Sequence, residues 1–192
     1  FVGSNNINLL SPNGNFGTRA QGGKDASAAR YIYTQLEDIT KYIFKKEDDN
    51  LLTYELDDDK NQIEPSYYLP IIPMILVNGC IGIGTGYSTN IPSFNPIDII
   101  KNLRRLMNDE NPKKMIPWYN NFEGEIVPTE DKNTFYCYGR YQVVNSKTED
   151  ILITELPIMV WTDNYYEFLL NLEKEKKIKK IYDYRFQTQA SF

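Results

Sequence analysis

A short segment near the start of the sequence places three phosphate-binding side chains next to a tyrosine. Lys24, Ser27 and Arg30 can each donate hydrogen bonds to phosphate oxygens, and Tyr31 follows Arg30 directly. The glycine and alanine residues between them would allow the backbone to approach a ligand closely. The spacing therefore indicates a candidate site for a phosphodiester.

Tyr31 is the candidate nucleophile of this segment. A tyrosine hydroxyl has an ordinary pKa of about 10, so it needs a neighbouring cation or base to attack a phosphorus atom. The guanidinium of Arg30 could also stabilise the negative charge that develops on a phosphodiester under attack. The sequence contains 15 tyrosines, so an ordinary core or surface position is the alternative for Tyr31.

A second segment, residues 79–86, alternates glycine with mostly apolar residues. It lacks a G-x-G-x-x-G motif that opens a helix and a following Lys-Ser/Thr pair, so it is a weak match to a nucleotide-binding loop. Two interpretations are left. The segment is a tight turn with Ile83 packed inside, or it is a loop that presents Ile83 as an apolar wedge, as in DNA-bending proteins.

Other chemistries find little support. The sequence has no histidine, which excludes a Ser-His-Asp triad, a Cys-His pair and zinc sites with histidine ligands. The acidic clusters at 47–49, 57–59 and 109–110 lack the spacing of an EF-hand and are typical of solvated surface. Cys80 and Cys137 are too few for a disulfide framework and favour a reducing compartment.

The composition is that of a globular protein, with 41% apolar and 24% charged residues among 192. The net charge of −5 argues against an autonomous DNA-binding domain. The longest apolar stretch, 71–77, is too short to span a bilayer. The sequence opens with Phe1 and has no leader, which suggests an internal piece of a longer protein.

The residue patterns predict a mixture of helices and antiparallel strands. Residues 52–64 alternate around a polar turn and predict a hairpin. Asn95 and Pro96 suit the start of a helix that should stop near 111–112, and a second helix should start at Thr162 or Asp163. Strands are expected at 125–127, 134–144 and 150–156.

Several motifs resemble one known family in combination. They cover residues 1–10, 14–19, 22–25, 29–32, 64–65, 68, 70–74, 78–79, 82–86, 102, 104–107, 121–122, 155–157 and 161–162. The chain closely resembles the breakage–reunion region of eukaryotic-type (type IIA) DNA topoisomerase II along nearly its whole length.

The resemblance implies roles for individual residues. Tyr31 would attack DNA to form a 5′-phosphotyrosyl link, and Arg30 would stabilise the transition state. Lys24 and Ser27 would lie near the DNA backbone, Ile83 would insert between base pairs, and Trp161 would contact DNA. The sequence departs from the family in having Ala29 where proline is usual and in lacking an acidic residue that the family often has near residues 79–82.

The resemblance also implies an α/β (α+β) fold in three parts. Residues 1–48 would complete a winged-helix domain that carries the tyrosine. Residues 49–95 would connect it, through the glycine-rich DNA-intercalating loop, to an α/β tower with antiparallel strands at 96–192.

The implied function is transient double-strand DNA cleavage, duplex passage and religation by an ATP-dependent type II topoisomerase. Mg²⁺ and ATP would bind outside this chain, which would be inactive alone and carry no metal site. The implied partners are double-stranded DNA and a second copy in a homodimer, with no membrane, and the implied location is the nucleus. A non-catalytic DNA-bending or interaction module is the alternative.

Overall fold

The computed structural model describes residues 5–131, 134–145 and 147–184. The first motif's residues 1–4 and the expected tower's residues 185–192 therefore lie outside the described residues. The helices, with η marking 3-10 helices, are η1 Ala29–Tyr31, α1 Asp38–Ile43, η2 Lys46–Leu51, α2 Met74–Asn78, α3 Pro96–Met107 and α4 Thr162–Lys174. The strands are β1 Tyr54–Leu56, β2 Gln62–Pro65, β3 Cys80–Gly84, β4 Tyr87–Ile91, β5 Glu125–Pro128, β6 Phe135–Tyr138, β7 Arg140–Asn145 and β8 Asp150–Glu155.

The strands form antiparallel pairs, each between neighbours in the chain: β1–β2, β3–β4, β5–β6 and β7–β8. The predicted α+β class with antiparallel strands is confirmed. The expected strand at 134–144 is two strands, because the chain breaks at Gly139 and its halves pair with different partners. A side chain at Gly139 would place its Cβ 2.3 Å from the carbonyl oxygen of Glu155, so the position requires glycine.

Helix α3 begins where the sequence predicts. The Asn95 side chain accepts a hydrogen bond from the backbone N–H of Ile97 at 2.9 Å, and Pro96 occupies the first helical position. The helix ends at Met107, before the predicted stop near 111–112. Arg105 accounts for part of the difference, since its backbone carbonyl accepts bonds from both Asn108 and Glu110 in the turn that follows.

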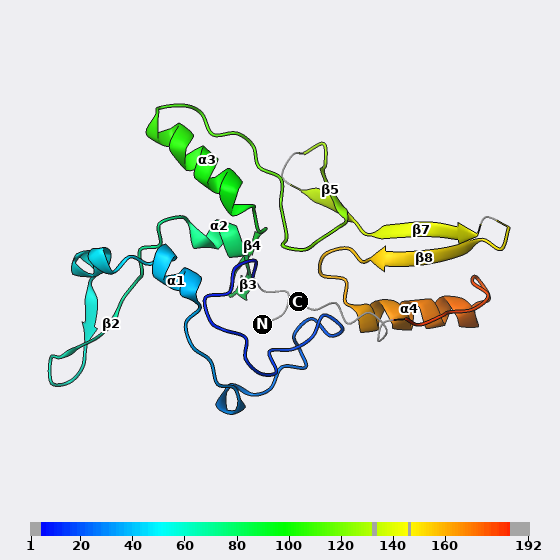
Figure 1. Ribbon diagram of the computed structural model, residues 1–192, viewed down its shortest axis with the longest axis horizontal. Helices are drawn as coiled ribbons and strands as arrows, with labels where there is room; N and C mark the ends of the chain where they lie inside the picture. Colours follow the sequence, from blue (N-terminus) through cyan, green and yellow to red (C-terminus); the bar gives the residue numbers. More distant parts are fainter. Residues whose placement is uncertain (1–4, 132–133, 146, 185–192) are drawn as a thin grey trace.

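Helix α4 begins at Thr162, one of the two predicted starts. It directly follows the β7–β8 hairpin, and Figure 1 shows the hairpin and the helix extending toward the same side of the molecule. Residues 156–161 connect the end of β8 to the start of α4, and we refer to them as the junction.

The amino-terminal segment forms hydrogen bonds with residues that are distant in the sequence. The Asn6 amide donates to the carbonyl oxygens of Val77 and Trp118, each at 3.0 Å. The backbone N–H groups of Asn6 and Ile7 donate to the Asn78 side chain at 3.0 and 2.9 Å. The two asparagines therefore satisfy backbone groups of the amino-terminal segment, of the end of α2 and of Trp118.

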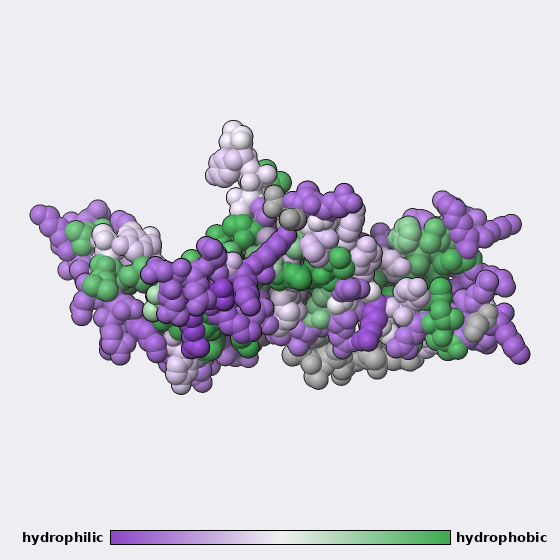
Figure 2. Space-filling model, turned by 90° about the horizontal axis from the view of Figure 1, so that it is seen from above, coloured by the Kyte–Doolittle hydropathy of each residue, from purple (hydrophilic) through white to green (hydrophobic). Residues whose placement is uncertain are grey.

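The core of the described residues is small. Its buried apolar residues are Ile43, Val77 and Ile99. The chain exposes 15314 Å², whereas a folded monomer of 22.4 kDa exposes about 9400 Å². Figure 2 shows apolar residues surfacing at several separate places on one face. This excess is typical of a segment that packs against further polypeptide.

The winged-helix assignment of residues 1–48 stays a prediction. The described part of this range contains η1, α1, the start of η2 and an isolated bridge between Leu10 and Leu36. No helix among the described residues has the length and the apolar character needed to cross a membrane.

Candidate functional site

Tyr31 and Arg30 lie together on an exposed turn. They belong to η1, which is closed by a hydrogen bond from the Ile32 N–H to the Ala29 carbonyl at 3.2 Å. The Tyr31 side chain is 69% exposed, and the Arg30 guanidinium carbon lies 5.0 Å from the centroid of its ring. The cation therefore stacks on the tyrosine face, and the tyrosine is open to a substrate from outside the chain.

Lys24 and Ser27 lie on the loop that leads into this turn. Thr18 donates to Asp25 twice, from its backbone N–H at 2.9 Å and its hydroxyl at 2.7 Å. Asn15 adds two contacts: its amide donates to the Asp25 carbonyl, and its own carbonyl accepts from the Ser27 N–H, each at 3.0 Å. The Lys24 side chain is left exposed. We refer to residues 15–27 as the basic loop.

The charge of Asp25 supports this loop at neutral pH. The hydroxyl of Thr18, and then its backbone N–H, lower the pKa of the Asp25 carboxyl. A lowered folded-state pKa means that the carboxylate favours folding at pH values above its ordinary pKa, and that this contribution is lost as the pH falls through the lowered value. At physiological pH the Asp25 carboxylate is therefore charged, and its hydrogen bonds with Thr18 hold the loop in place.

Ile83 lies on a hairpin and not on a loop, which corrects the sequence interpretation. Residues 80–84 form β3 and pair with β4 in a continuous register in which Ile83 faces Ser88. The ladder satisfies the backbone groups, and the turn falls at Thr85 and Gly86, where Gly86 has φ 83°. Ile83 is 92% exposed, so it is not packed inside a turn of the described residues.

Trp161 lies against the basic loop. The Arg19 guanidinium carbon is 5.4 Å from the centroid of the Trp161 ring. Gly22 has φ 63°, and a Cβ at this position would come within 2.1 Å of the ring, so the indole lies directly against the Gly22 backbone. Trp161 is half-buried here, and its predicted contact with DNA stays a prediction.

The structure thus brings five of the six predicted site residues into one region. Lys24, Ser27, Arg30 and Tyr31 follow one another along the chain, and Trp161 joins them through Gly22. Ile83 is separate: among the described residues, no hydrogen bond joins its hairpin to residues 24–31.

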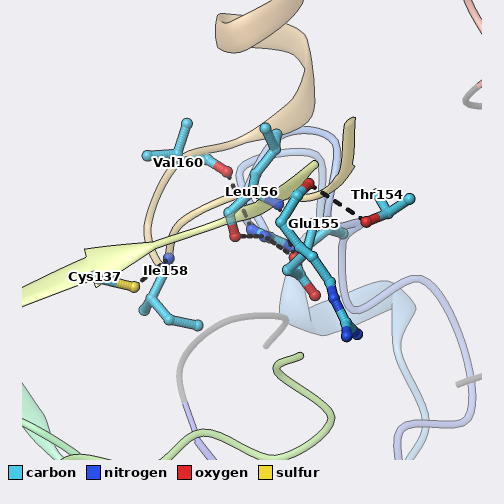
Figure 3. Close-up of polar contacts among 8 residues, drawn as sticks. Cys137, Thr154, Glu155, Leu156, Ile158 and Val160 are labelled. Atoms are coloured by element: carbon cyan, nitrogen blue, oxygen red, sulfur yellow. Dashed lines mark hydrogen bonds and ion pairs between the residues drawn. The ribbon is translucent and has the colours of Figure 1, made fainter. Parts of the chain in front are cut away.

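Arg19 also lies at this site, although the sequence patterns did not predict it, and it falls within a matched motif. Its guanidinium donates to the Val160 carbonyl at 3.2 Å and to the Leu156 carbonyl at 3.4 Å, and it pairs with the Glu155 carboxylate at 3.4 Å. These carbonyls and the carboxylate converge in the close-up of Figure 3. The sequence feature that could have pointed to Arg19 is its position as a lone arginine in a segment of glycine and small polar residues.

The acidic cluster at 57–59 forms a surface turn, and the one at 47–49 lies in η2. Asp57 accepts from the backbone N–H of Asn61 at 2.8 Å, a bond that lowers the pKa of its carboxyl most. Among the described residues, no group of three or more histidine, cysteine, aspartate or glutamate side chains could hold a metal ion. The carboxylates of the described residues therefore do not fit a Mg²⁺ site.

Comparisons with known proteins place the chain in the class of DNA topoisomerases. The family model for the A subunit of DNA gyrase/topoisomerase IV matches residues 1–192. The chain belongs to this family, and the predicted resemblance is confirmed.

Relatives and a solved structure are similar along most of the chain. DNA topoisomerase 2 of Candida albicans is 55% identical over 171 residues, which are 89% of this chain and 11% of that protein. The Saccharomyces cerevisiae protein of the same name is 54% identical over 180 residues, 93% of this chain and 12% of that protein. The DNA-binding, cleavage and re-ligation domain of Plasmodium falciparum topoisomerase II superimposes with a TM-score of 0.83 at 49% identity, covering 95% of this chain and 24% of that one.

The chain thus spans only 11% to 12% of the length of these two relatives. These similarities favour a piece of a type II topoisomerase over a DNA-bending module without catalysis.

Proposed function

We propose that this chain supplies the tyrosine nucleophile of an ATP-dependent type II DNA topoisomerase, which cleaves both strands of a duplex, passes another duplex through the break and reseals it. The observation that carries the proposal is the exposed Tyr31 with the Arg30 guanidinium stacked on its ring. Membership in the topoisomerase family supports it.

The proposed reaction exchanges one phosphate ester for another. The Tyr31 oxygen attacks a backbone phosphorus and forms a new P–O bond to the 5′-phosphate, while the bond to the 3′-oxygen breaks. The tyrosine loses its proton, and the departing oxygen gains one to become a 3′-hydroxyl. Attack by that hydroxyl on the phosphotyrosyl link reverses both changes, so resealing needs no further energy source.

Arg30 is proposed to stabilise the transition state. Because its charge is needed most when negative charge builds on the phosphate oxygens, Arg30→Ala in the full-length protein should slow cleavage and resealing by about 10²–10³-fold. DNA affinity should change far less. Single-turnover cleavage rates beside binding curves measure both quantities.

Arg104→Ala is the matched control, since Arg104 is an exposed arginine on α3, outside the candidate site. Cleavage by the Arg30→Ala variant at the unmodified rate would contradict the role, as would an equal loss in the control.

Lys24 is proposed to bind the DNA backbone through its charge. Lys24→Ala in the full-length protein should weaken binding uniformly across sequences and reduce the slope of log affinity against log salt by about 1. Titrations of labelled duplex at several salt concentrations measure this slope. An unchanged slope would remove Lys24 from the interface, and a loss confined to some sequences would indicate base contacts instead.

The remaining parts of the proposal concern the longer protein. We propose double-stranded DNA as the partner, a homodimer as the assembly, no membrane partner, and the nucleus as the location. Mg²⁺ and ATP are proposed to act at sites outside this chain. Ser27 is proposed as a further backbone contact and Trp161 as a contact from the tower, since Ser27 ends the basic loop and Trp161 lies against it.

The division into residues 1–48, 49–95 and 96–192 is likewise proposed. The asparagine helix cap and proline at 95–96 support the second boundary. Arg19 and Asn6 make contacts that cross the boundaries, so we expect the parts to move as one unit at these contacts.

A further inference from the structure

Arg19 makes a many-sided contact across a long sequence separation. Its side chain is 34% exposed, and its ion-pair partner Glu155 is 19% exposed. Val160, Leu156 and Glu155 are 141, 137 and 136 residues away in sequence. The Glu155 carboxylate is fixed in turn by the Leu156 backbone N–H, which donates to it at 2.9 Å. The planar guanidinium suits such a set of convergent acceptors, which a lysine ammonium could satisfy only in part.

Two further contacts hold the same loop against the junction and the start of α4. The Asp163 N–H donates to the Ala20 carbonyl at 3.1 Å, and the Trp161 ring lies on Gly22. Residues 19–22 are therefore held by side chain, backbone and ring at once.

The junction itself has a defined shape. The Val160 N–H donates to the Pro157 carbonyl at 3.1 Å and closes a turn, in which Met159 adopts a left-handed φ of 68°. Such a conformation is unfavourable for a non-glycine residue and persists where its surroundings enforce it. The Ile158 N–H donates to the Cys137 sulfur at 3.2 Å and ties the turn to β6, as Figure 3 shows.

A set of contacts leads from the neighbour of Arg19 across the basic loop, which ends at Ser27, two residues before η1. Thr18, the neighbour of Arg19, binds Asp25 through two hydrogen bonds and accepts a third from the Gly23 N–H at 3.1 Å. A Cβ at Gly17 would lie 2.5 Å from the Gly23 Cα, so the two sides of the loop touch backbone to backbone. The loop then passes through Ser27 into η1.

We propose that Arg19 is a positioning residue for the cleavage reaction: it locks the basic loop, and through it Tyr31, to the junction between β8 and α4. The inference rests on the proposed function. Arg19 does not touch the reacting atoms. It sets where Tyr31 stands relative to the β7–β8 hairpin and α4, so its loss lowers the rate of covalent attack and leaves DNA affinity nearly unchanged.

The test uses the full-length protein with Arg19→Ala and Arg19→Lys. A displacement of about 1 Å at a reacting group can cost up to about 100-fold in rate, so we expect Arg19→Ala to slow covalent-complex formation by about 10- to 100-fold. The Kd for duplex DNA should change by less than about twofold, since phosphate contacts dominate affinity. Hydrogen exchange should rise at amides of residues 17–27 and not in α3.

Arg19→Lys and one control variant make the test more specific. Arg19→Lys keeps the charge but not the planar fork, so it should show the same split between rate and affinity to a smaller extent; it carries the test if Arg19→Ala does not fold. Arg140→Ala is the matched control, because it removes an exposed ion pair with Glu123, 3.5 Å long, at the start of β7. It should cleave at the unmodified rate.

The outcomes separate the inference from the function on which it rests. If the unmodified protein forms no covalent complex through Tyr31, the proposed function fails. If the unmodified protein forms the complex and both Arg19 variants form it at the same rate, the positioning role is wrong. Equal losses in rate and affinity would also overturn it, since they would make Arg19 a DNA contact or a general stability residue.

Discussion

Tyr31→Phe is expected to abolish the covalent protein–DNA complex of the full-length protein, together with relaxation and strand passage. The substitution removes the one oxygen that would form the phosphotyrosyl bond and leaves the ring in place. Tyr31 is 69% exposed, so the free energy of unfolding should change by no more than about 0.5 kcal/mol. DNA affinity should persist. Denaturing gels of trapped complexes, melting curves and binding titrations measure the three quantities.

Tyr33→Phe is the matched control for this experiment. Tyr33 lies two residues further along the same segment and is 85% exposed, so it is at least as accessible as Tyr31. The Tyr33→Phe variant should cleave DNA at the unmodified rate. Persistent covalent complex in Tyr31→Phe, or its loss in Tyr33→Phe, would assign the nucleophile to another residue.

Ile83→Ala is expected to reduce the bend of bound DNA and to slow cleavage. Unstacking a base step costs a few kcal/mol, which a bent duplex recovers by touching more protein surface. The shorter alanine cannot hold the step open, so the scissile phosphates are brought to Tyr31 less often. Binding at low salt should barely change, because phosphate contacts dominate there. Energy transfer between labels at the duplex ends measures the bend.

Stability separates this prediction from the alternative of a packed residue. Ile83 is 92% exposed, so the variant should unfold almost like the unmodified protein. A packed isoleucine would instead cost about 2–5 kcal/mol with no change in bend. Ile63→Ala is the control, because Ile63 lies on another hairpin and is 58% exposed. A bend reduced equally by Ile63→Ala would also contradict the wedge.

Local rules predicted several elements from the sequence. Asn95 and Pro96 fixed the start of α3, since a side-chain cap and a proline act within one turn. The polar residues 57–61 located the β1–β2 turn, where Asp57 binds Asn61. These features depend on neighbours in the chain, so a single sequence suffices to locate them.

The features that the sequence did not reveal depend on distant partners. Gly139 separates β6 from β7 because the carbonyl of Glu155 leaves no room for a side chain. The glycine-rich segment became a strand because β4 pairs along its whole length, which overrides the turn preference of glycine. The contact of Arg19 with the junction spans more than a hundred residues and has no local signature.

The candidate site could be predicted only in part. The spacing of Lys24, Ser27, Arg30 and Tyr31 placed them in one segment, and the resemblance supplied their separate roles. The structure adds two contacts that neither the spacing nor the resemblance predicted: the stacking of Arg30 on Tyr31 and the packing of Trp161 on Gly22.

The most direct measurement is to identify the residue bonded to DNA. The full-length protein is trapped on duplex DNA, the DNA is trimmed to the linked nucleotide, and tryptic peptides are sequenced by mass spectrometry. We expect a 5′-phosphotyrosyl nucleotide on Tyr31, in the peptide that ends at Lys41, where fragment ions distinguish Tyr31 from Tyr33. A nucleotide on Tyr33 or in another peptide, or no linked peptide at all, would contradict it.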